Sequence, residues 1–286
     1  MALIRCPECN KEVSDKANFC IHCGFPLENY VKGIEKANFE DWDRRLVAAD
    51  SLPPAEMLRE LIKLGEEGFV RGYDNAGFYY FENGNFEEAY KYYRLAQEAD
   101  PTDGNVMNNI GWLYAQRGFS GFNPAVAMDY LKQSDIGMAH NNLAQIYQGL
   151  VAGFEAYAND ELAIEHYELA VERGYREPHV YNNLGCLYSD VRCHYVYAAA
   201  YCHLAQITEG ELTAADRKLF KDNYDTTMQL VEENSGTAWI DHIKNITAPE
   251  EIEGMIDFVN SEIERYTGSR THNRTRCPDC GCEFIS

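Results

Sequence analysis

A short segment recurs four times along this chain, and its spacing restricts the fold more than any other feature. The clearest copy, Tyr181–Tyr188, reads Tyr-Asn-Asn-Leu-Gly-Cys-Leu-Tyr. When the four copies are aligned on one asparagine, the intervals are 34, 33 and 41 residues; the aligned positions are Asn75, Asn109, Asn142 and Asn183. Such a repeat length predicts stacked helical hairpins, because one hairpin alone cannot bury both of its faces.

Each copy is followed by a second pattern, in which a small residue comes seven positions after an alanine. The pairs are Ala89 and Ala96, Ala127 and Ser134, Ala163 and Ala170, and Ala198 and Ala205. In the first helix a small residue allows close approach of the partner helix, and the tyrosine three residues later fills the gap beside it. These small residues are Gly77, Gly111, Ala144 and Gly185. The sequence therefore predicts a mainly α fold, an α-α superhelical solenoid of helical hairpins.

Residues 70–210 resemble the tetratricopeptide repeat family and its Sel-one-like relatives. The match rests on the Asn-Leu-Gly-x-x-Tyr and Ala-x-x-x-Tyr cores, and on the repeat ending Glu98–Pro101. The longer third repeat fits the Sel-one-like spacing, with a loop insertion expected over Gly149–Asn159. The fourth copy lacks the usual glycine turn between Ser189 and Tyr195. The resemblance implies a surface, lined by the first helices, that binds a protein or a peptide.

Two Cys-x-x-Cys pairs lie near the N-terminus. Cys6 and Cys9 form the first pair, and Cys20 and Cys23 form the second after ten intervening residues. Paired thiolates at this separation predict a four-cysteine zinc site, since each pair supplies one tight knuckle of a tetrahedron. The segment is too short to build a sufficient apolar core, so the metal is expected to stabilise it. It resembles the short zinc-ribbon family in all four ligands and in Phe19.

The other segments are assigned by their position relative to the ribbon and the repeats. The expected order is a zinc ribbon at 1–27, leading helices or an N-terminal cap at 33–68, repeats at 69–210, capping helices at 211–266 and a tail at 267–286. Pro26–Lys32 is interpreted as a linker. Thr213–Asp216 predicts a capping box at the start of a helix.

The tail contains a third Cys-x-x-Cys pair, which repeats the Cys-Pro-acid-Cys order of Cys6–Cys9. The candidate ligands of a second metal site are Cys277, Cys280, Cys282 and His272. A second molecule could instead supply the missing ligands and make the chain a homo-oligomer. Free thiols are the alternative to metal binding.

The formal net charge of −21 is concentrated in the middle of the chain. Residues 1–30 carry three basic and four acidic groups, and residues 267–286 carry three basic and two acidic groups. Residues 31–266 therefore carry −21, which disfavours binding to nucleic acid phosphates and suits a basic protein partner. The alternative is that this charge only keeps the chain soluble.

The sequence also predicts a cytoplasmic location. It contains no stretch of 18 apolar residues, and Met1–Arg5 leads directly into the cysteine motif without the pattern of a signal peptide. We therefore expect no membrane contact. In a reducing compartment, cysteine pairs point to metal before disulfide.

No catalytic pattern is found, whether a nucleophile elbow, a His-Glu-x-x-His zinc motif, a phosphate loop or a dinucleotide fingerprint. His166 and His203 are interpreted as packing residues of the second helices. The preferred hypothesis is a non-enzymatic interaction scaffold. One alternative is a nucleic-acid- or transcription-associated adaptor that reads with the ribbon, although the ribbon offers only Arg5, Lys11 and Lys16. Another is a thiol redox or metal-relay protein that uses the tail cysteines.

Carrying the family pattern onto the first helices gives a candidate partner-binding set. Its members are Asn108, Trp112, Asn141, Gln145 and Asn182. The amides could bind the backbone of an extended peptide, and Trp112 is the candidate anchor because tryptophan is enriched at interface hot spots. The alternative is that the paired asparagines bridge neighbouring helices.

Overall fold

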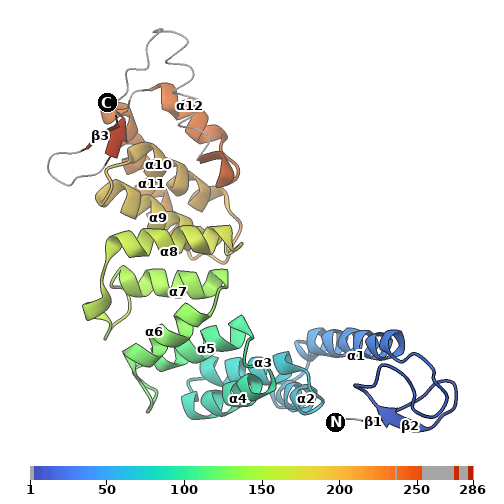
Figure 1. Ribbon diagram of the computed structural model, residues 1–286. Coiled ribbons are helices and arrows are strands. Elements are labelled where there is room, and N and C mark those ends of the chain that lie inside the picture. Colours follow the sequence, from blue (N-terminus) through green and yellow to red (C-terminus); the bar gives the residue numbers. More distant parts are fainter. Residues whose placement is uncertain (1–2, 236, 253–273, 277–282, 286) are drawn as a thin grey trace. The chain divides into compact units, whose positions relative to one another are not determined.

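Helices make up most of the chain in the computed structural model, which describes residues 3–235, 237–252, 274–276 and 283–285 (Figure 1). The chain divides into two compact units, residues 1–109 and 110–286, with the boundary inside one helix. Each unit is described by itself below. None of the helices in the described ranges is both long and apolar enough to span a membrane.

The first unit begins with a two-stranded antiparallel sheet that leads directly into a long helix. Strand β1 (Leu3–Arg5) pairs with β2 (Glu12–Ser14), and helix α1 covers Glu28–Ala49. The linker expected over Pro26–Lys32 is wrong, because Leu27 is buried in the ribbon core and Tyr30 and Val31 pack against that core. The ribbon core thus continues into the first turn of α1.

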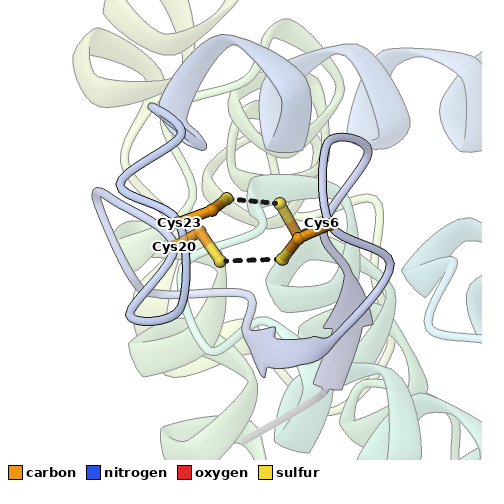
Figure 2. A group of neighbouring side chains, drawn as sticks. Cys6, Cys20 and Cys23 are labelled. Atoms are coloured by element: carbon orange, nitrogen blue, oxygen red, sulfur yellow. Dashed lines mark hydrogen bonds between the residues drawn. The ribbon is translucent and has the colours of Figure 1, made fainter.

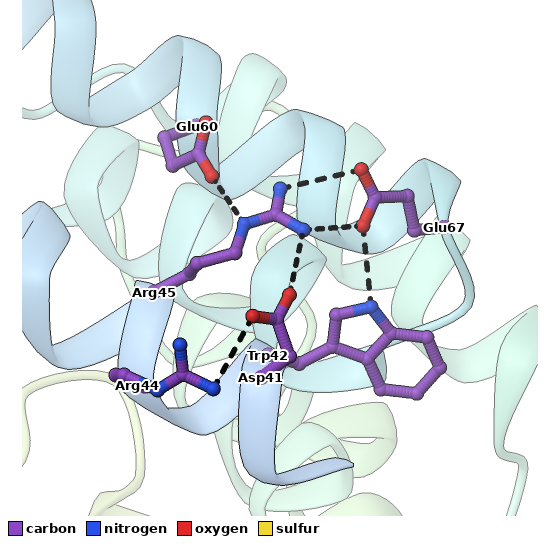
Figure 3. Close-up of polar contacts among 6 residues, drawn as sticks. All are labelled: Asp41, Trp42, Arg44, Arg45, Glu60 and Glu67. Atoms are coloured by element: carbon purple, nitrogen blue, oxygen red, sulfur yellow. Dashed lines mark hydrogen bonds and ion pairs between the residues drawn. The ribbon is translucent and has the colours of Figure 1, made fainter. Parts of the chain in front are cut away.

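Helix α1 is held against α2 (Pro54–Glu66) by a network centred on Arg45 (Figure 3). The Nε of Arg45 donates to Glu60 at 2.7 Å, and its two terminal nitrogens donate to Glu67 at 2.5 and 3.2 Å. The indole nitrogen of Trp42 also donates to Glu67, at 3.2 Å. The hydrogen bonds from Arg45 are the main cause of a pKa of Glu67 that lies below its usual value.

We expect Arg45→Ala to lower the free energy of unfolding by about 1–2 kcal/mol, because it removes charged hydrogen bonds that are only partly screened by water. Arg44→Ala is the matched control. The Arg44 side chain is 72% exposed, against 24% for Arg45, and its one ion pair in the described structure, to Asp41, is 3.4 Å long. Chemical denaturation at pH 7 measures both. An equal effect of the two variants would contradict the role of the network.

The same network predicts a pH dependence with a definite sign. Since the pKa of Glu67 is depressed in the folded state, its contribution is present above the unfolded value of 4.5 and is lost as the pH falls through the folded value. Arg45→Ala should therefore cost less stability at pH 3 than at pH 7.

The predicted helical hairpins are present. In the first unit α3 (Val70–Glu82) packs against α4 (Phe86–Ala99), and α5 (Gly104–Tyr114) crosses into the second unit, where α6 (Pro124–Gln133) follows it. Two further hairpins come next: α7 (Gly137–Tyr147) with α8 (Asp160–Glu172), and α9 (Pro178–Asp190) with α10 (Tyr195–Ile207). The mainly α, hairpin-repeat fold class is confirmed.

The small residues of the first helices lie where the sequence pattern places them. A Cβ atom added to Gly77 would lie 2.5 Å from the Tyr93 ring, and one added to Gly111 would lie 2.9 Å from Leu131. At Gly185 it would overlap the sulfur of Cys202. Each of these partners comes four residues after the alanine of the second pattern. The close helix contact is therefore the same in these hairpins.

A stacked ring pair accompanies each contact and joins the first helix to the second. The pairs and their centroid distances are Tyr80 and Tyr92 at 5.4 Å, Tyr114 and Tyr130 at 6.1 Å, Tyr147 and His166 at 5.3 Å, and Tyr188 and Tyr201 at 5.5 Å. The first member is the tyrosine three residues after the small residue. These rings fill the gap that the small residue leaves.

The turns between paired helices differ in length but close with the same hydrogen bond. The carbonyl of that tyrosine accepts from the backbone N–H of the residue that precedes the second helix. The donors and acceptors are Asn85 to Tyr80, Asn123 to Tyr114, Asn159 to Tyr147 and His194 to Tyr188, at 2.7 to 3.0 Å. Residues inserted between the tyrosine and the start of the second helix therefore leave the register of the two helices unchanged. In the fourth turn Cys193 adopts a positive φ of 51°, a conformation usually taken by glycine.

The loop expected over Gly149–Asn159 is present and contains the short helix η1 (Glu155–Tyr157). A second insertion, residues 115–123 between α5 and α6, was not expected. The two insertions contact each other, because the ring of Phe122 meets that of Phe154 edge to face at 6.3 Å. Phe154 is fully buried, so these loops extend the core of the second unit.

Helices α11 (Ala214–Asn234) and α12 (Ala238–Asn245) follow the repeats. The predicted capping box is confirmed, since Thr213 Oγ1 accepts from the N–H of Asp216 at 3.2 Å and the Asp216 carboxylate accepts from the N–H of Thr213 at 2.9 Å. The strands β3 (Arg274–Arg276) and β4 (Glu283–Ile285) pair antiparallel.

Candidate metal centre and partner-binding surface

The four N-terminal cysteines converge on one point between the two knuckles (Figure 2). Their sulfur atoms all lie within 4.8 Å of one another, with Cys6 to Cys23 and Cys9 to Cys20 both at 3.6 Å. A tetrahedron with Zn–S bonds of about 2.3 Å has edges of about 3.8 Å. The sulfur positions therefore fit a zinc ion. Within the described ranges, no other group of three or more potential metal ligands meets in this way.

Both knuckles are built by the same backbone hydrogen bonds. The carbonyl of the first cysteine accepts from the residue four positions later, Asn10 in one knuckle and Gly24 in the other, both at 2.8 Å. These two residues have φ values of 57° and 77°, a region open to asparagine and glycine. The N–H of Cys6 donates to Lys11 at 3.0 Å, and that of Cys20 donates to Phe25 at 2.8 Å.

The electrostatics of the cysteine cluster favour the binding of a cation. Burial opposes ionisation of Cys20, but the backbone N–H groups of His22 and Cys23 outweigh it and lower its pKa to about 7. For Cys23 the N–H of Phe25 lowers the pKa, yet burial and the neighbouring thiols raise it to about 12. Four thiolates so close together repel one another, and a divalent cation would remove that repulsion. The imidazole of His22 is exposed, so its contribution is the backbone N–H.

The predicted partner-binding set is largely buried. Asn108, Asn141 and Asn182 are only 2%, 7% and 6% exposed, whereas Trp112 and Gln145 are half-buried. Little of the three amides is therefore open to a peptide. Partner binding by the set stays a prediction, and the accessible part of it is Trp112 and Gln145.

Some of the paired asparagines form hydrogen bonds to a neighbouring helix, which agrees with the structural alternative. Asn109 donates to Asp74 at 2.8 Å, and burial, partly offset by this bond, raises the pKa of Asp74 to about 6. In the second unit Asn223 of α11 donates to Asn182 at 2.8 Å. Asn223 lies 40 residues after Asn183 and continues the asparagine series. The sequence contains this signal, but the surrounding Leu-Gly-x-x-Tyr pattern is lost there.

On these helices an exposed position lies four residues, about one helical turn, before the asparagine that was used for the alignment. Four residues before Asn142 lies Met138, which is 44% exposed, and four before Asn223 lies Leu219, which is 50% exposed. His179, four before Asn183, is also exposed. Apolar side chains open to solvent at equivalent positions of a repeat are candidates for contact with a partner.

A histidine pair links α7 to α8 in the second unit. Nδ1 of His140 lies 3.0 Å from Nδ1 of His166, and Nε2 of His140 lies 3.2 Å from Asp135, whose carboxylate also accepts from Arg173. Since a carboxylate only accepts, neutral His140 donates from Nε2 and accepts from His166 at Nδ1. The sequence places these histidines 26 residues apart and contains no sign of the pair.

We expect acidification to weaken the second unit through His166. Burial, with His140 and Lys132 nearby, lowers the pKa of His166 to about 4. Its contribution to stability is therefore present above the unfolded value of 6.5 and is lost as the pH falls towards 4. His166→Gln should reduce the loss of stability between pH 6.5 and 4 by roughly 1–2 kcal/mol, after allowance for solvent screening. Identical pH profiles of wild type and variant in urea denaturation would contradict this role.

The candidate second metal site lies outside the described residues. Its members are Cys277, Cys280, Cys282 and His272. The flanking strands β3 and β4 pair with each other antiparallel.

Comparison with known proteins finds similarity for the N-terminal cysteine segment and for the helical fold. Residues 5–27 match the zinc-ribbon domain family. No curated protein sequence matches the chain. Among solved structures, c5321, a protective antigen of uropathogenic Escherichia coli with an SLR fold, is similar over 79% of this chain, with a TM-score of 0.55 and 17% identity. PilF of Pseudomonas aeruginosa covers 63% of this chain and 98% of its own, with a TM-score of 0.30 and 18% identity.

The similarity to c5321 shows the fold and extends over 47% of that protein, so this chain matches about half of its length. Repeats of this kind were expected from the Asn-Leu-Gly-x-x-Tyr pattern, and the expectation is confirmed. The chain thus has an N-terminal segment that matches the zinc-ribbon domain family, followed by helical repeats whose fold is similar to the SLR fold of c5321.

Proposed function

We propose that this protein is a non-enzymatic scaffold that binds a protein partner through the first helices of its repeats, with the ribbon as a structural zinc module. The observation that carries the proposal is the repeated exposure of the position one turn before each aligned asparagine. In the second unit this position presents Met138 on α7 and His179 on α9, and the equivalent position of α11, which follows the repeats, presents Leu219. Successive repeats of a solenoid can present such positions to one extended partner.

The chemistry of the described residues supports binding rather than catalysis. Four thiolates around one zinc ion leave no open position for a substrate or a water. The pair formed by His140 and His166 is engaged with Asp135 and lies between two helices. The cytoplasm is the compartment that we propose, because free thiols suited to zinc persist there.

The charge supports a basic partner. The −21 carried by residues 31–266 would attract a positively charged protein and raise its rate of association. We expect the affinity of such a partner to fall as the salt concentration rises. A nucleic acid would be repelled by the same charge.

We expect Trp112→Ala to weaken partner binding by about 2 kcal/mol, the loss typical of an interface hot spot. Met138→Glu should also weaken binding, because it puts a charge in an apolar contact. A partner captured from lysate and identified by mass spectrometry would be purified and titrated calorimetrically against wild type and variants. Circular dichroism checks that each variant keeps its helices.

Leu52→Glu is the matched control, since Leu52 is an exposed leucine in the turn between α1 and α2, outside the repeats. It should leave the affinity unchanged. If Trp112→Ala and Met138→Glu both bind like wild type, the partner does not use these helices, and the proposed surface is wrong.

A further inference from the structure

An asparagine at the aligned position donates a hydrogen bond to the preceding first helix in two places. Asn109 of α5 donates to Asp74 of α3 at 2.8 Å, and Asn223 of α11 donates to Asn182 of α9 at 2.8 Å. In both places the acceptor comes directly before the aligned asparagine of its own helix. The next helix along the chain thus supplies the donor for a polar side chain that is largely buried.

The same bond is missing on α7. By this rule Asn183 of α9 should donate to Asn141, but it donates to the hydroxyl group of Tyr167 in α8, at 2.9 Å. The side chain of Asn141 is only 7% exposed, and it forms no hydrogen bond to any residue that the structure describes. Among those residues only His194 has a fully enclosed side-chain nitrogen or oxygen atom without a hydrogen bond. The small part of Asn141 that is open to solvent therefore includes its amide.

Gln145 adds a second amide on the same face of α7. It follows Asn141 by four residues, it is half-buried, and its side chain also lacks a hydrogen bond within the described part of the chain. The equivalent positions of α9 are Asn182 and Cys186, and Asn223 contacts both, at 2.8 and 3.4 Å. The two amides of α7 are thus open to a ligand, whereas the equivalent groups of α9 are engaged with α11.

We propose that the amides of Asn141 and Gln145 bind the backbone of an extended segment of the protein partner, which lies along α7 with an apolar side chain against Met138. This rests on the proposed function and specifies how the partner is held. Four helical residues rise about 6 Å, and alternate residues of an extended strand are about 6.6–6.8 Å apart, so each amide can pair with the N–H and C=O of one alternate residue. Met138 is 44% exposed and lies three residues before Asn141 on the same face.

The chemistry of the two amides favours a peptide backbone over other ligands. A side-chain amide both donates and accepts, as a peptide group does, whereas an anion only accepts. Residues 110–252 carry 9 basic and 20 acidic side chains, a net charge of −11, which repels anions and attracts a basic segment. A helical partner has already paired its backbone groups along its length, so it could not use both amides.

The test uses the full chain and a library of random peptides displayed on phage. Phage that bind the variant with both Asn141→Ala and Gln145→Ala are removed first, and the remainder are selected on wild type. We expect extended peptides with basic residues, and each single variant should weaken their binding about threefold to tenfold, the loss typical of one hydrogen bond. Methylation of the peptide N–H groups, one at a time, should weaken binding at two positions that are two residues apart.

Two further variants separate binding from folding. Asn141→Ala should keep the stability of wild type, because its amide has no partner among the described residues, whereas Asn182→Ala should unfold at a lower urea concentration because it loses the bond from Asn223. Gln133→Ala, at an exposed position of α6, is the matched control for binding and should leave the affinity of the peptides unchanged.

The proposal is wrong if no peptide distinguishes wild type from the double variant, or if methylation is tolerated at every position of the peptides. It is also wrong if Asn141→Ala and Gln145→Ala bind the captured partner like wild type while Met138→Glu weakens that binding. In this last case the first-helix surface of the proposed function stands, and only the backbone contact is lost.

Discussion

Cys9→Ser is expected to release the ribbon zinc and unfold residues 3–27, while most of the helical signal remains. The ribbon core consists of the buried residues Cys6, Val13, Cys20 and Leu27 with a few half-buried neighbours, which is too little to fold without metal. Structural zinc contributes apparent binding energies of about 10–16 kcal/mol in comparable small modules, so its loss exceeds what this core can supply.

The helices should survive because they have cores of their own. The cluster around Leu61, Leu64 and Ala76 in the first unit shares no residue with the ribbon cluster. The measurements are elemental analysis for zinc, amide NMR for the ribbon signals and circular dichroism for helix content. Removal of zinc from wild type by a chelator should give the same NMR change.

Cys186→Ser controls for the loss of a thiol elsewhere, since Cys186 lies in α9, outside the ribbon. It should keep its zinc and its ribbon spectrum. Ribbon signals that stay dispersed in Cys9→Ser without zinc would show that the module folds through its apolar contacts alone.

Gly185→Val is expected to lower the free energy of unfolding by about 1–3 kcal/mol, the range for overpacking a close contact. An added Cβ would overlap the sulfur of Cys202 and lie 2.9 Å from the carbonyl oxygen of Ala198. The sulfur can rotate away, but the backbone of α10 cannot yield without separating the two helices. Thermal and urea denaturation measure the effect.

Helix propensity alone predicts the opposite sign, because valine is favoured over glycine within a helix by a few tenths of a kcal/mol. Ala125→Val, at an exposed position of α6, measures the propensity cost of a β-branched side chain without a steric contact. If Gly185→Val is as stable as wild type, the two helices do not cross at this residue in solution.

Periodic and local features of the fold could be predicted from the sequence. Gly77, Gly111 and Gly185 recur at one position of the repeat because the two helices of each hairpin approach each other closely there. The clustering of the four N-terminal cysteines was predictable because a knuckle depends on only a few consecutive residues. The contacts with Tyr93, Leu131 and Cys202 confirm the register that the repeat implied.

Contacts between residues that lie far apart in the sequence could be found only from the tertiary structure. The early start of α1 depends on Leu27 entering the ribbon core, and no local pattern marks that burial. The Arg45 network joins residues up to 26 positions apart, from Asp41 to Glu67. In the same way, His140 meets His166 only because α7 and α8 pack together.

The asparagines show most clearly the difference between what the sequence determines and what the tertiary structure determines. Their spacing is a property of the sequence, and it identifies the repeat. Whether an amide faces a partner or another helix is decided by what packs beside it, and for Asn182 that neighbour is Asn223 of α11, in a segment where the repeat pattern has decayed. A buried amide must find a hydrogen-bond partner inside the protein, so the packing of the next helix decides the role of the one before it.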